Sequence, residues 1–255
     1  MSRAAATSRT VLVTGGSRGI GRAIARAFAA HGDTVAVHCN SRSDDADITL
    51  SGLAGEGHRV VRGDLTDPEE VRRVVGEAAG ERGLDVLVNN AARMEPHPIV
   101  GTSYEVWQSA WSRTLDVNLV AAANASYCAA HSMIAGGRPG HIVNIASRGA
   151  FRGEPDHPAY GASKAALIAM GQSLAVALAP HRICVTSVAP GFIETERVAA
   201  RLEGDEGAAI RSQSPFGRVG TPEEVASAVL YLASPEAMWS SGTVLDVNGA
   251  SHLRM

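Results

Sequence analysis

Short apolar runs alternate with helix-like segments along almost the whole chain of 255 residues. The apolar runs lie at 10–16, 34–39, 58–65, 85–91, 141–147, 182–191 and 243–249. Each run is rich in β-branched residues and nearly uniformly apolar, which is the pattern of strands covered on both faces. Strands that alternate with helices predict an α/β fold, with a doubly wound parallel sheet of about seven strands and helices on both of its faces.

Two of the intervening segments carry clear helix starts. Thr66 and Thr221 each lie just before a proline at an early helical position and acidic residues in the first turn. Two further long helices are expected at 103–135 and 159–179, where apolar residues dominate. The stretch "LDVNLVAAANASYCAAHSMIA" is interrupted by polar residues, so it predicts a buried or interface helix and no membrane span.

The sequence shows no linker, internal repeat or low-complexity segment, so we expect a single domain over residues 1–255 with a flexible tail at 1–8. The longest irregular parts are expected at 148–157 and 192–217. Long loops that follow strand C-termini in such sheets usually cover a ligand site, so 192–217 is the expected substrate lid.

The composition excludes several classes of protein. A net charge of −3 argues against nucleic acid or an anionic membrane as the main partner, because both call for a basic surface. Three distant cysteines without a C-x-x-C pair indicate neither a disulfide framework nor a zinc site, and the nine histidines show no metal spacing, so no metal is expected. The polar start of the chain has no signal-peptide pattern, and we expect a cytoplasmic location.

The first apolar run leads directly into the glycine-rich turn "TGGSRGIG". Gly15, Gly19 and Gly21 lie there at a strand-to-helix junction, where glycine allows a sharp turn and a close approach to a pyrophosphate. The following helix offers free N–H groups and the positive end of its dipole. The spacing G-x-x-x-G-x-G differs from the usual dinucleotide fingerprint, and its position in the chain is what favours a dinucleotide site over simple tight packing.

The end of the second apolar run predicts which dinucleotide is bound. An acidic residue usually holds the ribose 2′-hydroxyl of NAD at that point, and here Cys39 stands in its place. Asn40, Ser41 and Arg42 follow, and Arg18 lies inside the glycine turn. Two arginines without a carboxylate suit a 2′-phosphate, so NADP(H) is expected in preference to NAD(H). The alternative is that both arginines are ordinary solvated surface charges.

Six motifs together carry a resemblance to a known family. They are "TGGSRGIG" at 14–21, "NNAA" at 89–92, "DVNL" at 116–119, Ser147, "YGASK" at 160–164 and "PGFIET" at 190–195. In this order and spacing the chain resembles the short-chain dehydrogenases/reductases over essentially its whole length. The resemblance implies a Rossmann-type fold and a nicotinamide cofactor. The chain departs mildly from the family pattern at "NNAA" and at "VNGA" near its end, and neither departure touches the catalytic set.

The resemblance also implies a set of site residues. The catalytic group falls on Ser147, Tyr160 and Lys164 with an assisting Asn118, which in the family holds a water that links the lysine to solvent. Contacts to the dinucleotide fall on Gly15, Ser17, Arg18, Gly19, Ile20, Gly21, Asn40, Ser41, Arg42, Asp64, Leu65, Asn90, Ala91, Tyr160, Lys164, Pro190, Gly191, Ile193 and Thr195. Among these, Asp64 falls on the adenine side and Ile193 and Thr195 near the nicotinamide carboxamide.

Lys164 is the only lysine in the chain, although there are 23 basic residues. It follows Tyr160 by four positions, so the two side chains share one face of a helix. A tyrosine can give a proton to the alkoxide formed by hydride transfer, but its ordinary pKa is about 10, and a nearby cation lowers that pKa. Ser147 ends a strand and can donate a hydrogen bond to the substrate oxygen. An ordinary surface pair is the alternative for Tyr160 and Lys164 considered alone.

The residues predict an NADPH-dependent reductase of a ketone, or the reverse oxidation of a secondary alcohol, with a similarity to 3-oxoacyl-carrier-protein reductases. An NAD-linked sugar, polyol or steroid-type alcohol dehydrogenase is a second hypothesis, and a non-catalytic dinucleotide sensor is a third. Arg93, Arg148 and Arg152 are candidates to meet an acidic substrate, and His157 is a candidate to line the pocket, although such residues more often face solvent. The resemblance implies a homodimer or homotetramer, which we expect to be built on 103–135 and 159–179.

Overall fold

The computed structural model describes residues 8–40 and 44–254, and these form an α/β fold around one seven-stranded sheet. All neighbouring strands are parallel, and their order is β3-β2-β1-β4-β5-β6-β7. The strands are β1 Thr10–Val13, β2 Thr34–Cys39, β3 Arg59–Arg62, β4 Val86–Asn89, β5 Gly140–Ile145, β6 Ile183–Pro190 and β7 Val244–Val247. The predicted Rossmann-type, doubly wound parallel sheet of seven strands is therefore confirmed.

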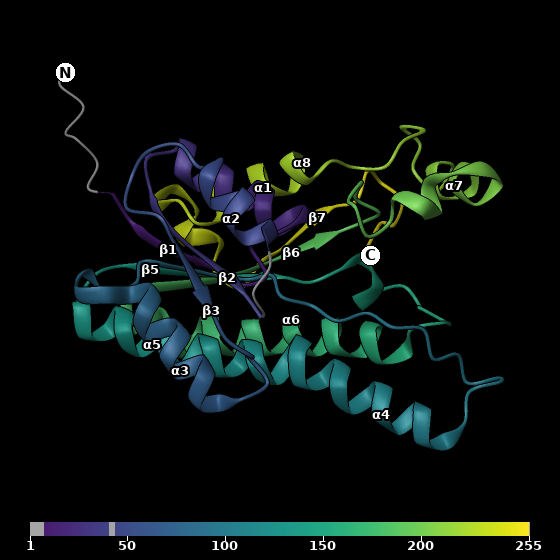
Figure 1. Cartoon of the computed structure of the whole chain (residues 1–255), viewed down its shortest axis with the longest axis horizontal. Coiled ribbons are helices and arrows are strands. Elements are labelled where there is room, and N and C mark those ends of the chain that lie inside the picture. The colour runs from purple at the N-terminus through teal and green to yellow at the C-terminus, as the bar shows by residue number, and fades with distance from the viewer. Residues whose placement is uncertain (1–7, 41–43, 255) are drawn as a thin grey trace.

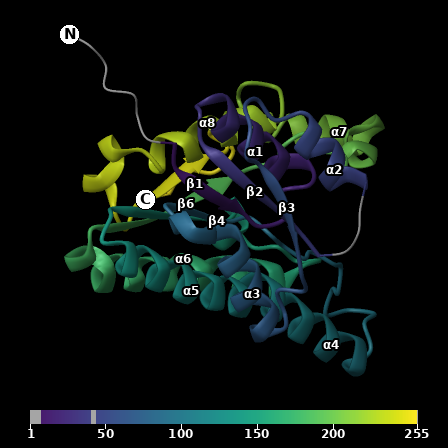
Figure 2. The same ribbon diagram turned by 60° about the vertical axis from the view of Figure 1, so that its left-hand side comes forward.

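Helices cover both faces of the sheet, as Figures 1 and 2 show from two directions. One face carries α1 Gly19–Ala30, α2 Asp44–Ser51 and α8 Pro222–Leu232. The other carries α3 Pro68–Ala79, α4 Tyr104–Leu115, α5 Ala121–Gly136 and α6 Pro158–Leu178. The short helix α7 Gly204–Arg211 lies beyond the sheet, at the end where the strands finish. The strand order reverses direction between β1 and β4, which is where such sheets bind ligands.

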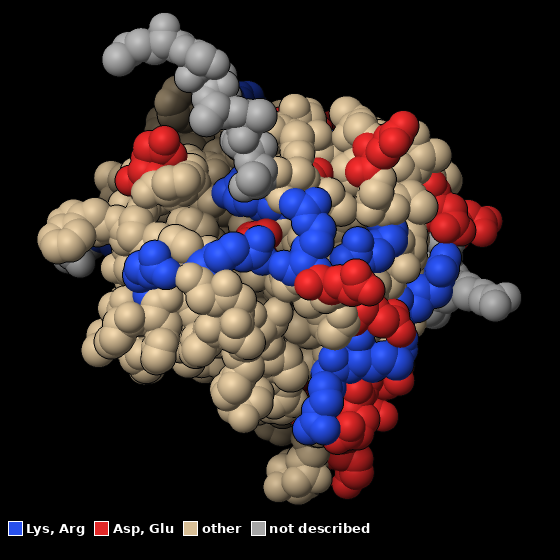
Figure 3. Space-filling model, turned by 90° about the vertical axis from the view of Figure 1, so that its left-hand side faces the viewer, with Lys and Arg blue, Asp and Glu red and all other residues tan. Residues whose placement is uncertain are grey.

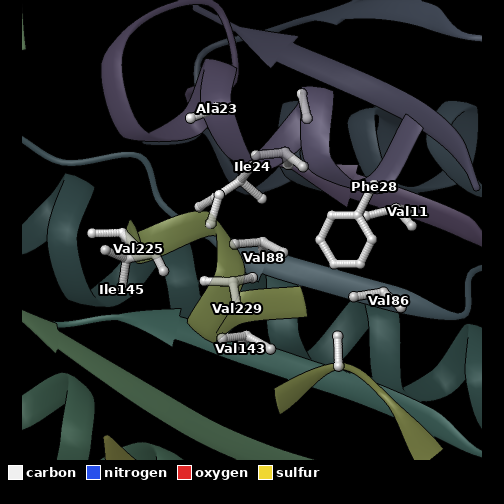
Figure 4. Close-up of a cluster of buried hydrophobic side chains, with 14 of the residues drawn as sticks. Val11, Ala23, Ile24, Phe28, Val86, Val88, Val143, Ile145, Val225 and Val229 are labelled. Atoms are coloured by element: carbon white, nitrogen blue, oxygen red, sulfur yellow. The ribbon is translucent and has the colours of Figure 1, made fainter. Parts of the chain in front are cut away.

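The two faces of the sheet bury alternate residues of the same strands. Val11 and Val13 of β1 pack with α1 and α8, and Leu12 between them packs with the helices on the opposite face. Figure 4 shows the first of these clusters, in which Phe28 and Val229 lie over the strand valines. Side chains of a strand point to opposite faces in turn, and a sheet covered on both sides makes every position apolar.

The strands end earlier than the apolar runs that predict them. Thr14 and Gly16 belong to the first apolar run, but in the structure the chain is already turning there, after β1 has ended at Val13. Apolar residues continue past the hydrogen-bonded ladder because the loops at this end are also covered, so hydrophobicity alone overestimates strand length.

The prediction of irregular chain at 192–217 was wrong in part. A 3₁₀ turn at Ala199–Leu202 and helix α7 lie within it. Gly207 packs so closely on Leu202 that a Cβ at this glycine would lie 2.0 Å from the Leu202 carbonyl oxygen. The low apolar content of α7 hides it from the helical pattern, since only Gly207 and Ile210 of this helix are buried. The segment 148–157 likewise starts with a 3₁₀ turn at Arg148–Ala150.

The long helix expected at 103–135 consists of α4, a π-helical turn at Asp116–Val120, and α5. The turn contains one of the predicted site residues, Asn118, which is buried. A π-helical turn adds one residue to the hydrogen-bonded ring and is frequent at functional sites. The sequence pattern did not reveal this turn, although it contains the polar residues Asp116 and Asn118.

By length and composition, Pro158–His181 could cross a membrane, with a mean hydropathy of 1.4. The helix α6 within it packs on the sheet and buries Ala159, Ser163, Lys164 and Leu167, among others. A core helix of a soluble domain meets the same criteria, so the segment alone is no evidence for a membrane span.

Figure 3 shows the face turned away from α7, where basic and acidic side chains lie beside one another.

Candidate active site

The glycine turn between β1 and α1 adopts backbone conformations that suit glycine. Gly15 and Gly19 have positive φ angles of 61° and 51°. Gly21 is needed for a different reason, because a Cβ there would lie 2.3 Å from the carbonyl oxygen of Gly15 and 2.5 Å from the Asn90 amide nitrogen. The turn is thus folded tightly against the end of β4, and larger residues at these positions would disrupt it.

Asn90 and Thr14 lock this turn in place. The Asn90 side-chain amide donates to the carbonyl oxygens of Thr14 and Gly15, at 2.8 and 3.0 Å. The Thr14 hydroxyl in turn accepts from the backbone N–H groups of Asn90 and Ala91. The contact of Asn90 to the dinucleotide stays a prediction, and in the structure its side chain holds the turn. Thr14 was not predicted.

His38 is a second residue that the sequence did not reveal. It is buried on β2, its Nδ1 accepts a hydrogen bond from the Gly15 N–H at 3.1 Å, and its Nε2 lies 3.0 Å from the carbonyl oxygen of Gly63. This pattern requires the neutral ring with its proton on Nε2. Burial lowers the pKa of His38 and so favours that neutral form. The imidazole joins the glycine turn to the end of β3.

Helix α1 begins at this turn without a capping side chain or an acidic residue in its first turn. Its first N–H groups and the positive end of its dipole therefore point toward the end of the sheet, which fits a pyrophosphate. Gly19 lies close to Thr195 of the loop after β6, because a Cβ on Gly19 would lie 3.2 Å from the Thr195 methyl group. Two predicted contact residues from distant parts of the chain thus border one narrow space.

The expected adenine side lies at the ends of β2 and β3. Asn40 and Asp64 are exposed there, and the Asp64 carboxylate accepts from the Thr66 N–H and hydroxyl groups. Arg18 is 67% exposed and lies 3.5 Å from Asp45 of α2. Leu65, the residue after Asp64, is buried. Ser41 and Arg42, two of the predicted contacts, lie outside the described residues.

Arg22 holds this region together and was not predicted. Its guanidinium donates to the Ser17 carbonyl and to Thr49 of α2, and it forms an ion pair with Asp45 at 3.4 Å. It also reaches Glu196 in the loop after β6, at 3.3 Å. One side chain thus connects the glycine turn, α2 and the loop after β6.

Ser147, Tyr160 and Lys164 come together at the end of β5. Ser147 follows β5, its hydroxyl accepts from the Gly149 N–H at 2.9 Å, and its side chain is hydrogen bonded to Tyr160. Lys164 is only 2% exposed and donates to the Ile145 carbonyl oxygen at 2.7 Å. Its ammonium nitrogen lies 5.7 Å from the centre of the Tyr160 ring. The three predicted catalytic residues are therefore neighbours in space.

Burial dominates the electrostatics of this group. It raises the pKa of Tyr160, while the hydrogen bond to Ser147 lowers it. It lowers the pKa of Lys164 to about 7, with a smaller contribution from the positive charge of Arg197. A lysine that titrates near neutral pH can take up and release a proton during turnover.

The Asn118 side chain contacts both the loop after β4 and helix α6. Its side chain accepts from the Arg93 N–H at 2.7 Å and donates to the Arg93 carbonyl at 2.9 Å and to the Ser163 hydroxyl at 3.0 Å. The Ser163 hydroxyl donates to the Tyr160 carbonyl at 2.7 Å. The side-chain amide is therefore used to fix the loop after β4 against helix α6.

The remaining predicted contacts lie on the loop after β6. Gly191 donates its N–H to the Val247 carbonyl, and a Cβ there would meet Asn248 at 3.0 Å. Pro190 is buried as the last residue of β6, and Ile193 is 5% exposed. This part of the chain borders the same end of the sheet as the glycine turn. Among the described residues, no group of three His, Cys, Asp or Glu side chains could hold a metal ion.

Comparisons with known proteins agree with this arrangement. Residues 15–252 match the family model described as enoyl-(acyl carrier protein) reductase. The chain is 36% identical to a 3-oxoacyl-[acyl-carrier-protein] reductase FabG of Vibrio harveyi, over 96% of this chain and 98% of the relative. The chain belongs to the short-chain dehydrogenase/reductase family.

Two further relatives of this family differ in their substrates. The chain is 37% identical to the cis-4-hydroxycyclohexanecarboxylate dehydrogenase of Sinomonas cyclohexanicum, over 94% of this chain and 95% of the relative. A solved structure from Agrobacterium tumefaciens, provisionally assigned as a 2-deoxy-d-gluconate 3-dehydrogenase with bound NADP, aligns with a TM-score of 0.84. That protein is 32% identical, and the alignment covers 95% of this chain and 96% of the other. The short-chain dehydrogenase/reductase described here is thus an oxidoreductase of alcohols and carbonyl compounds that binds a nicotinamide dinucleotide.

Proposed function

We propose that the protein is an NADPH-dependent reductase of a ketone, reversible with the corresponding secondary alcohol. The observation that carries the proposal is the hydrogen bond between Tyr160 and the Ser147 side chain, together with the buried Lys164, whose ammonium nitrogen lies 5.7 Å from the centre of the Tyr160 ring. A bound nicotinamide dinucleotide supplies the hydride. Ser147 donates a hydrogen bond that polarises the substrate carbonyl, and Tyr160 gives its phenolic proton to the developing alkoxide.

Lys164 supports the proton transfer in this proposal. Its positive charge favours the phenolate form of Tyr160, and its lowered pKa lets it exchange a proton with solvent near neutral pH. Asn118 holds Tyr160 in position through Ser163, whose hydroxyl donates a hydrogen bond to the Tyr160 carbonyl. We assign Asn118 a positioning role.

The preference for NADPH rests on the end of β2. Cys39 occupies the place where an acidic residue would repel a 2′-phosphate, and burial raises the pKa of its thiol, so it is uncharged at neutral pH. Arg18, in the glycine turn, is exposed and lies 3.5 Å from Asp45 of α2. The relative from Agrobacterium tumefaciens that carries bound NADP favours the same assignment.

An NAD-linked dehydrogenase of sugars or polyols is the second candidate. One relative is assigned to a sugar acid, which supports that substrate class, although this relative carries NADP. We also propose a cytoplasmic homodimer or homotetramer built on α4, α5 and α6, where Tyr104, Tyr127 and Val176 are large apolar side chains left 65–79% exposed. Segment 192–217, with α7, is the proposed substrate lid.

The decisive experiment is steady-state turnover of a panel of ketones, sugars and secondary alcohols with NADPH and NADH in parallel. We expect at least one ketone to be reduced, with kcat/KM higher for NADPH. Higher kcat/KM with NADH would transfer the assignment to the NAD-linked dehydrogenase. Binding of NADPH without turnover of any carbonyl would instead indicate a dinucleotide sensor.

A further inference from the structure

Arg148, the residue directly after Ser147, is buried with a full positive charge. It is 6% exposed, although it lies on a short 3₁₀ turn at the edge of the active site. Its guanidinium donates to the Ser251 hydroxyl at 2.8 Å and to the Gln213 side-chain carbonyl at 3.0 Å. It also lies over the ring of Phe192, 5.2 Å from the ring centre. All of these partners are uncharged.

Among the described residues, no carboxylate lies within ion-pair distance of Arg148. Glu154 acts on it only through space, and burial lowers the pKa of Arg148. Removing a charge from water without a counter-ion costs several kcal/mol, and buried charges are therefore normally paired. The two neutral acceptors satisfy two of the five N–H groups of the guanidinium, and its charge is offset only through space, by Glu154.

Arg148 forms part of the wall of a cavity of about 410 Å³. The cavity is bounded by Phe192 after β6, by Ile210 of α7 with the segment that follows it, and by residues 246–251 after β7. This volume lies in the range of small-molecule sites. The cavity thus has an aromatic wall and a cation held in a fixed position.

The other charges that line the cavity are already balanced. Arg218 pairs with Glu224 at 2.6 Å, and Asp246 pairs with Arg254 at 2.7 Å. These two pairs cancel, so the lining retains the one positive charge of Arg148. An entering anion would gain a charge-assisted contact there without losing an existing ion pair.

We propose that this cavity binds a carboxylate, with Arg148 as the residue that recognises it. Gln213 and Ser251 hold the guanidinium in place, and its unused N–H groups offer the planar fork that suits a carboxylate. The carboxylate belongs either to the carbonyl substrate itself, in which case the inference rests on the proposed function, or to a separate organic anion.

The test uses benzoate and benzamide, which have the same shape and differ in charge. Binding of each to the full chain is measured by isothermal titration calorimetry, without turnover. We expect benzoate to bind at least tenfold more tightly than benzamide. Equal affinity for the two would overturn the proposal, and this comparison needs no variant.

Variants then locate the binding. Arg148→Met should lower the affinity for benzoate at least tenfold. Arg148→Lys keeps the charge without the planar fork, so its affinity for benzoate should lie between those of Arg148→Met and the wild type. Arg152→Met is the matched control, because Arg152 is exposed and shares the Gln213 acceptor at 3.1 Å. It should change benzoate affinity less than threefold. Benzoate affinity within twofold of wild type in a folded Arg148→Met variant, or an equal loss in Arg152→Met, would place the anion elsewhere.

Inhibition kinetics distinguish the two sources of the carboxylate. Benzoate that competes with an uncharged ketone substrate indicates that the site is shared with the substrate, so that the natural substrate is an oxo acid. Benzoate that binds together with the ketone indicates a separate anion. Absence of turnover with every carbonyl would contradict the proposed function and leave the calorimetric result intact.

Discussion

The ammonium group of Lys164 donates a 2.7 Å hydrogen bond to the backbone carbonyl of Ile145, the last residue of β5. The contact anchors the only lysine of the chain to the strand that leads to Ser147. An ammonium is compact and sits on a flexible stem, whereas a guanidinium is a larger planar group. The space beneath Tyr160 is therefore suited to one cation and unsuited to the other.

Lys164→Arg should retain the fold and lose most of the activity. The guanidinium keeps the charge, but in a side chain that is 2% exposed its greater size must displace Tyr160 or the end of β5. Circular dichroism checks the fold and kcat/KM checks the activity. Turnover equal to wild type would show that the identity of this cation does not matter.

Lys164→Met tests the lowered pKa of about 7. In the unfolded chain the lysine titrates near 10.4, so between pH 7 and that value the unfolded state binds more protons and wild-type stability rises with pH. Below pH 7 the full cost of burying the ammonium is present. The stability of the methionine variant relative to wild type should therefore be greatest at pH 6 and decline by roughly 3 kcal/mol at most by pH 9.5.

Urea unfolding of both proteins at the two pH values measures this difference. Tyr160→Phe serves as the control, because it leaves the lysine in place. A relative stability of the methionine variant that does not change with pH would mean that Lys164 keeps an ordinary pKa in the folded chain.

Tyr160→Phe should abolish turnover and leave dinucleotide binding nearly intact. The ring still fills its place, but the hydroxyl that is bonded to Ser147 is lost and no proton can be donated. Turnover and NADPH fluorescence titration measure the two properties separately. A loss of less than about tenfold, or roughly 1.4 kcal/mol of barrier, would identify another acid.

Arg42→Ala and Arg18→Ala should each weaken the binding of NADPH far more than the binding of NADH. The two dinucleotides differ only in the 2′-phosphate, and a guanidinium recognises that group through paired hydrogen bonds. Michaelis constants for both cofactors provide the measurement. Arg26→Ala is the control, because Arg26 is an exposed arginine of α1 that lies about two helical turns after Arg18. Equal losses for both cofactors would assign the arginines to general electrostatic attraction.

Asn118→Ala should reduce both stability and kcat. It removes all three side-chain bonds and leaves the backbone N–H and carbonyl of Arg93 without these partners, which costs on the order of 1–3 kcal/mol. Ser163→Ala removes the bond from Asn118 to α6 and the bond from the Ser163 hydroxyl to the Tyr160 carbonyl, but keeps both Arg93 bonds, so it should affect kcat with a smaller loss of stability. Unfolding and kcat together distinguish these roles, and an unchanged kcat in both variants would contradict the positioning role.

The sequence predicts those features that depend on neighbours in the chain. The apolar runs predicted each strand, and the spacing of Tyr160 and Lys164 placed both on one helix face, as α6 confirms. It does not reveal His38 or Arg22, because their partners are distant: Arg22 and Glu196 lie 174 positions apart. A polar residue inside an apolar run, as His38 is within β2, was the one available signal.

The packing of α1 against α8 has a consequence for the biosynthesis of the chain. Phe28 and Ile24, near the start of the sequence, share one buried cluster with Val225 and Val229 near its end. A ribosome must therefore translate almost the whole message before this face of the sheet can close. Until then the nascent chain presents an apolar surface to its surroundings, and we expect its folding yield to depend on elongation speed and on chaperones that shield this surface.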